Sequence, residues 1–110
     1  MIPKRVKIRG VRGGWLAEVE GKWLAVLHHT QRVPPNRYVA PIRPQDIGTK
    51  RLAGLLDALR GNDLVVIQKD KDAVSLARDG YVGVFRFTDL VVDDQREFSL
   101  TLTDIYARPK

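Results

Sequence analysis

Hydrophobic and polar residues alternate from the start of the chain. In residues 5–9, Val6 and Ile8 alternate with three cations, at positions 5, 7 and 9. Successive side chains of an extended chain point to opposite sides, so this alternation is typical of a half-buried strand. It predicts one strand over residues 5–9, with Val6 and Ile8 facing a core and a cationic outer face.

Two further strands are predicted on either side of Gly21, over residues 15–20 and 23–28. If Gly21 and Lys22 form a two-residue type II′ turn, Trp15 and Trp23 lie on opposite faces of the hairpin. A three-residue loop would place both tryptophans on one face. The alternation allows both registers, and they bury Trp23 differently.

The middle of the chain contains the clearest helix. Four prolines between positions 30 and 45 exclude a helix and a central strand there, and leave residues 38–39 as a candidate short extended piece. The leucines at positions 52, 55, 56 and 59 then repeat at helical spacing. We expect one main helix over about residues 49–60, with Asp46 or Thr49 as its N-cap and Gly61 at its end.

The rest of the chain predicts three more strands. Residues 64–67 form an unbroken apolar run, which indicates a strand covered on both faces, and residues 81–92 and 98–103 alternate. Residues 72–78 suit a brief helical turn. Helices are too few for a parallel doubly wound sheet. The expected class is α+β, mostly β, in a single domain over residues 1–110: a small, partly closed antiparallel barrel or a curved sheet.

Charge is unevenly distributed along the chain. It carries 19 basic and 13 acidic residues, for a net charge of +6, and its pI is about 10.0. Residues 1–60 hold twelve basic and four acidic residues, and residues 61–110 hold seven and nine. The first half is therefore at +8 and the second at −2. This favours an anionic partner that the N-terminal half would contact.

Other chemistry has little support in the composition. The absence of cysteine excludes disulfides, thiolate nucleophiles and cysteine-ligated metals. His28 and His29 would point to opposite faces of a strand, so they cannot bind one ion together, and we expect no metal and no cofactor. Neither Ser75 nor Ser99 lies in a Gly-x-Ser-x-Gly elbow, so we expect a binding protein rather than an enzyme. With no apolar run long enough to cross a bilayer, we expect a cytoplasmic protein without membrane contact.

One stretch of the second half resembles a known family. Residues 61–67 (GNDLVVI) and, after a polar connection, residues 80–90 (GYVGVFRFTDL) resemble the PUA-like superfamily, in particular its ASCH and EVE types. In those types an apolar strand after Gly-Asp is followed by a Gly-x-x-Gly strand and a final hydrophobic strand; here Asn62 separates the Gly from the Asp. The resemblance implies a small pseudo-barrel that binds RNA or a modified DNA base in a cleft beside the barrel.

We therefore expect a small, non-catalytic module that binds RNA or DNA. Cations would contact phosphates, and an aromatic residue would stack on a base. The candidate residues are Lys4, Arg5, Lys7, Arg9 and Arg12 for phosphate, and Trp15, Trp23 or Tyr38 for stacking.

Two alternatives stay open at this point. The first is a protein-interaction domain or small assembly subunit, including a homo-oligomer. It is based on the apolar strand positions Leu16, Leu27, Val82 and Val84. The second is a small nucleic-acid hydrolase in which one of the two histidines acts as the base.

Overall fold

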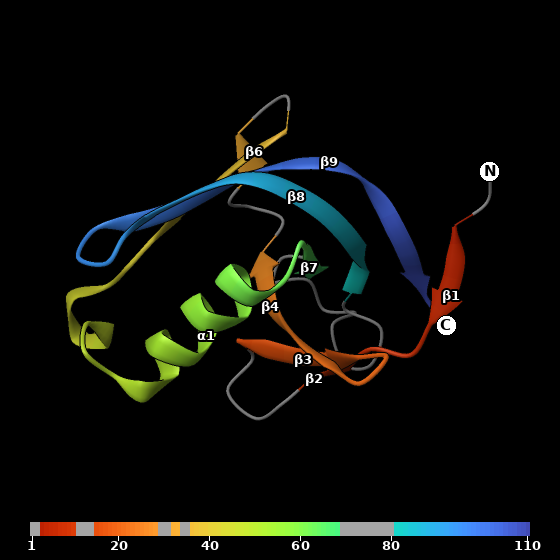
Figure 1. Cartoon of the computed structure of the whole chain (residues 1–110), viewed down its shortest axis with the longest axis horizontal. Coiled ribbons are helices and arrows are strands. Elements are labelled where there is room, and N and C mark those ends of the chain that lie inside the picture. The colour runs from red at the N-terminus through yellow and green to blue at the C-terminus, as the bar shows by residue number, and fades with distance from the viewer. Residues whose placement is uncertain (1–2, 11–14, 29–31, 34–35, 69–80) are drawn as a thin grey trace, which may run out of the picture.

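The computed structural model describes residues 3–10, 15–28, 32–33, 36–68 and 81–110. Strands dominate these residues, and a single helix lies inside the curve of the sheet (Figure 1). The elements are β1 (Lys4–Val6), β2 (Arg9–Gly10), β3 (Leu16–Val19), β4 (Lys22–His28), β5 (Arg32–Val33), β6 (Arg37–Pro41), the 3-10 turn η2 (Pro44–Asp46), α1 (Lys50–Gly61), β7 (Leu64–Gln68), β8 (Tyr81–Asp93) and β9 (Glu97–Pro109).

These strands form one mixed, curved sheet. Its order is β2-β3-β4-β7-β8-β9-β6-β5, and β1 pairs with β9 outside this path. The β1–β9 and β4–β7 pairs are parallel, and the other pairs are antiparallel. The α+β, mostly β class with a curved sheet and one main helix is therefore confirmed. The sheet is not closed into a barrel, and the helical turn predicted at residues 72–78 lies outside the described residues.

The predicted strand over residues 5–9 is wrong in its extent. It is split into β1, which runs parallel to β9, and β2, which runs antiparallel to β3. Because β9 and β3 lie far apart in the sheet order, Lys7 and Ile8 cross between them and belong to neither strand. The predicted facing is confirmed: Val6 and Ile8 contact a core, and the cations at positions 5, 7 and 9 are exposed.

The hairpin resolves the question of register. Val19 pairs with Lys22, so the two turn residues are Glu20 and Gly21 rather than Gly21 and Lys22. Both have positive φ, 51° and 79°, which is the type I′ geometry and not the expected type II′. Within the paired strands the faces are those of the two-residue alternative, but Trp15 precedes β3 and contacts the core that Ala25 and Leu27 face. Ala17, Val19, Leu24 and Val26 face one core, and Ala25 and Leu27 face the other.

The helix begins as predicted and ends differently. The Thr49 hydroxyl accepts a hydrogen bond from the Leu52 amide at 3.2 Å, and the four leucines of the predicted stripe are buried. Gly61 was expected to stop the helix, but it is the last helical residue and its φ is not positive. Asn62 caps the end instead, because its Nδ2 donates to the Ala58 carbonyl at 2.9 Å.

Two hydrophobic clusters form the core. The main core joins the buried face of α1 to residues of β4, β6, β7, β8 and β9. The second core includes residues of β1, β3, β4, β7, β8 and β9. β7 contributes to both, with Val65 and Ile67 in the main core and Leu64 and Val66 in the second. The prediction that this strand is covered on both faces is confirmed.

Candidate nucleic-acid interface

Two arginines from opposite ends of the chain lie side by side on the outer surface. The parallel register of β1 and β9 makes Arg5 the direct partner of Arg108, and both are exposed. Arg5 Nη1 donates to the Pro109 carbonyl at 3.2 Å, and Arg108 Nη1 donates to the Val82 carbonyl at 3.3 Å. Like charges directly opposite one another on neighbouring strands repel. An anion bound between these two guanidinium groups would relieve that repulsion.

Further cations extend this pair. The Lys110 amide donates to the Val6 carbonyl at 2.9 Å, so the parallel contact continues past β9 and brings Lys110 level with Lys7. Arg9 follows on β2. We call the exposed residues Arg5, Lys7, Arg9, Arg108 and Lys110 the basic stripe. Figure 1 shows its backbone, with β1 beside the end of β9 and the chain continuing into β2.

The stripe has little compensating negative charge. Within the described ranges, Arg9 contacts a carboxylate, with Nη1 3.6 Å from Glu18 Oε1, and the other four cations have no carboxylate within 4 Å. Elsewhere in the described ranges four cations are paired with carboxylates, whereas Lys22, Lys50 and Arg96 have none within 4 Å. These pairs are Lys4–Glu20, Arg43–Asp46, Arg60–Asp94 and Arg86–Asp104. Arg5, Lys7, Arg108 and Lys110 therefore form a run of neighbouring cations without a carboxylate beside them among the described residues.

Lys4, a predicted phosphate contact, is engaged within the protein. Its Nζ donates to Tyr106 Oη at 2.6 Å and to Glu20 Oε2 at 3.2 Å, and Tyr106 Oη donates to Glu20 Oε1 at 2.8 Å. The hydrogen bonds with Tyr106 and then with Glu20 raise the pKa of Lys4 above 10.5. The hydrogen bonds from Tyr106 and then Lys4 lower the pKa of Glu20 below 4.5. This cluster joins β1 and β9 to the β3–β4 turn, and Lys4 is less available to a ligand than Arg5 or Lys7.

The three candidate stacking residues lie apart. Trp15 is half-buried, and the guanidinium of Arg51 covers its ring at 4.3 Å from the centroid. Trp23 is 49 % exposed at the start of β4. Tyr38 is 2 % exposed and lines a cavity that neither tryptophan reaches. The remaining predicted phosphate contact, Arg12, lies outside the described residues.

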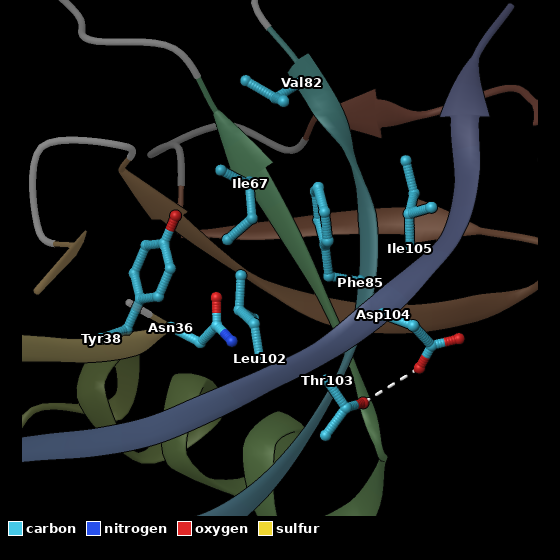
Figure 2. A pocket seen from close by; sticks show the side chains of 9 residues that line it. All are labelled: Asn36, Tyr38, Ile67, Val82, Phe85, Leu102, Thr103, Asp104 and Ile105. Carbon is cyan, nitrogen blue, oxygen red and sulfur yellow. Dashed lines mark hydrogen bonds between the residues drawn. The ribbon is translucent and has the colours of Figure 1, made fainter. Parts of the chain in front are cut away.

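The cavity beside Tyr38 has a volume of about 160 Å³ and a mostly apolar wall. Figure 2 shows Tyr38 and Phe85 on opposite sides of Ile67 and Leu102. Its one carboxylate, Asp104, accepts hydrogen bonds from the Thr103 hydroxyl at 3.0 Å and from Arg86 at 2.7 Å. The lining residues are Asn36, Tyr38, Ile67, Val82, Phe85, Leu102, Thr103, Asp104 and Ile105, and none belongs to the basic stripe.

Sequence reasoning missed Arg108 and Lys110. The final strand was expected to end at residue 103, but β9 continues to Pro109. A signal was present, because a strand predicted over residues 81–92 needs a partner of similar length. Pro109 is accommodated as the last residue of β9.

Comparison with protein-family models, with curated proteins and with solved structures finds no match for this chain. Across the residues that the structure describes, no three His, Asp or Glu side chains are grouped to hold a metal ion. The same residues contain no helix long and apolar enough to cross a membrane. The side chain of His28 and all of His29 lie outside the described residues. The structure therefore does not place the histidine side chain that was predicted to act as the hydrolase base. The basic stripe is the feature from which a function is argued.

Proposed function

We propose that this protein binds nucleic acid, RNA or DNA, through the phosphate backbone and without catalysis, using the basic stripe. The observation that carries the proposal is the direct pairing of Arg5 with Arg108, with no carboxylate beside either among the described residues. A guanidinium group presents a planar fork of donors that matches two phosphate oxygens. Contacts of this kind hold and orient a nucleic acid without reading its sequence.

The protein-interaction alternative receives less support. Leu27 and Val84 are buried, at 2 % and 0 % exposure. Leu16 and Val82 are half-buried and contact the main core. The apolar strand positions on which that alternative was based are thus used within the fold.

The test is a double charge reversal at the arginine pair, Arg5→Glu with Arg108→Glu. Binding of fluorescently labelled single-stranded and duplex oligonucleotides of mixed sequence is measured by anisotropy at low salt. Both affinities should fall by roughly ten-fold or more, because phosphate contacts contribute to binding of any sequence. Circular dichroism should show unchanged secondary structure, since both side chains are exposed.

The matched control is Lys50→Glu with Arg96→Glu, which changes the net charge by the same amount. Both residues are exposed, at the start of α1 and in the β8–β9 turn, away from β1 (Figure 1). The control should bind nearly as tightly as the wild type. The proposal is overturned if the two double variants weaken binding equally, or if the wild-type protein binds neither RNA nor DNA at low salt.

A further inference from the structure

Building on the proposed function, we infer that the ligand is single-stranded nucleic acid and that Trp23 stacks on one of its unpaired bases. The inference starts from the exposure of this residue. Trp23 is 49 % exposed, although large aromatic side chains are mostly covered in folded proteins. About half of its surface is therefore accessible to a ligand.

The backbone of Trp23 is firmly held. It pairs with Glu18 across the β3–β4 hairpin, and its carbonyl accepts a hydrogen bond from Asn62 Nδ2 at 3.2 Å. The next two residues, Leu24 and Ala25, are fully buried. The indole is thus a side chain on a fixed support, which lowers the entropy lost when a base stacks on it.

Trp23 belongs to a row of residues that begins on the basic stripe. Arg9 pairs with Glu18, and Glu18 pairs with Trp23, so the three side chains project from the same face of β2, β3 and β4. Neighbouring strands lie about 4.8 Å apart, which puts the Trp23 backbone roughly 10 Å from that of Arg9. The Glu18 carboxylate lies between them and forms an ion pair with Arg9, with Oε1 3.6 Å from Nη1.

This arrangement suits a single-stranded nucleic acid whose sugar–phosphate backbone follows the basic stripe and whose base stacks on the indole of Trp23. From Arg5 to Arg9 the chain spans at most about 13 Å, the length of four extended residues, so the stripe can contact successive phosphates along it. Bases in a duplex are already stacked on one another, and only an unpaired base can place its face on an indole. The two other aromatic candidates do not offer this platform, because Arg51 covers Trp15 and Tyr38 is buried.

The experiment compares single-stranded and duplex affinities for Trp23→Ala, Trp23→Phe and wild type. Trp23→Ala should weaken single-strand binding by roughly 5- to 160-fold, because stacking on an aromatic side chain contributes that much per base. Its duplex affinity should stay within about two-fold of wild type. Trp23→Phe keeps an aromatic face and should retain most of the single-strand affinity. Val91→Ala is the matched control, since it truncates another exposed apolar side chain, and it should change neither affinity.

A spectroscopic readout reports on the indole itself. In a Trp15→Phe background, the emission of Trp23 should be quenched when a single strand binds and should stay unchanged with duplex. The inference is overturned if Trp23→Ala leaves single-strand affinity intact, or lowers single-strand and duplex affinity alike, while Arg5→Glu with Arg108→Glu still weakens binding. In that case the proposed function stands. Failure of wild type to bind either form would instead remove the proposed function and this inference together.

Discussion

At the scale of single residues, Asn62 links two parts of the fold. Its side-chain amide donates to the Ala58 carbonyl in the last turn of α1 and to the Trp23 carbonyl on β4. The first bond satisfies a carbonyl that a helix end leaves without an internal partner. The second ties the helix to the sheet next to the proposed stacking residue.

Replacing Asn62 by Asp should destabilise the protein by about 1–2 kcal/mol. The change removes both amide donors and places a negative charge at the helix C-terminus, where the macrodipole disfavours it. Urea unfolding measures the difference. Asp57→Asn, an exchange of the same two groups on the exposed face of α1, should stay within about 0.5 kcal/mol of wild type. Equal effects at the two positions would contradict the role given to Asn62.

Glu20 is a second residue with a special position. Its φ of 51° is uncommon for a residue other than glycine, and its carboxylate is held by Tyr106 and Lys4. These hydrogen bonds lower the pKa of Glu20 in the folded protein below 4.5. The ionised form is therefore favoured by folding.

The stability contributed by Glu20 should depend on pH with a defined sign. A carboxyl whose pKa is lowered by folding stabilises the protein above its unfolded pKa and loses this effect as pH falls through the folded value. Wild type should exceed Glu20→Gln in free energy of unfolding at pH 7, and the gap should narrow below pH 4.5. In Tyr106→Phe, the pKa of Glu20 measured by NMR should move back towards 4.5, because the largest cause of the shift is removed. A gap that does not change with pH would contradict this assignment.

At the scale of elements, the β8–β9 ribbon sets the shape of the sheet. The two strands have 13 residues each, and their register shifts between Val84 and Phe85, between Phe85 and Phe87, and between Thr88 and Val91. Such irregularities bend a strand and increase its twist. The strands also approach closely at Gly83, where a Cβ would lie 2.9 Å from the Ala107 carbonyl oxygen.

Gly83→Ala should therefore destabilise the protein by about 1–3 kcal/mol, because a backbone atom of β9 must move to admit the methyl group. Gly61→Ala supplies the contrast. A Cβ at Gly61 meets nothing within 4 Å, and the residue is helical, so alanine should stabilise by about 0.5 kcal/mol. Chemical denaturation of both variants measures this difference in sign. If both variants changed the free energy of unfolding in the same direction, the close approach of β9 to Gly83 would not be what makes alanine unfavourable there.

At the scale of the whole molecule, the segment from Lys4 to Gly10 joins distant parts of the sheet. β1 lies on β9 and β2 lies on β3, with Val6 and Ile8 against the second core. Its cations therefore lie beside the end of β9 and continue to β2. Three cations of the first 60 residues, at positions 5, 7 and 9, thereby join two cations from residues 108 and 110.

The salt dependence of binding follows from this assembly of charge. If the five cations of the basic stripe each contact a phosphate of a single strand, log K should fall against log salt with a slope of about 3–4. Titrations between about 50 and 200 mM salt would measure it. In Arg5→Glu with Arg108→Glu the slope should become shallower by about 1–1.5, because two contacts are lost. An unchanged slope would place the phosphate contacts elsewhere.

Part of the candidate site was predictable because it depends on local alternation. The cations at positions 5, 7 and 9 face outward as predicted, since Val6 and Ile8 are drawn into a core by burial of apolar surface. The partners of those cations were not predictable. Glu20 and Tyr106 engage Lys4, and Arg108 joins Arg5, through contacts between residues more than a dozen positions apart.

The order of hydrophobic and polar residues by itself determined the helix, the doubly covered strand β7 and the mostly β class, because periods of 3.6 and 2 act within one element. Only the tertiary structure decided the splitting of the first strand, the Glu20–Gly21 turn and the length of β9. It also decided which of Trp15, Trp23 and Tyr38 is exposed to solvent. These features follow from which strand lies beside which. That choice is made by packing between segments far apart in the chain, and no local period encodes it.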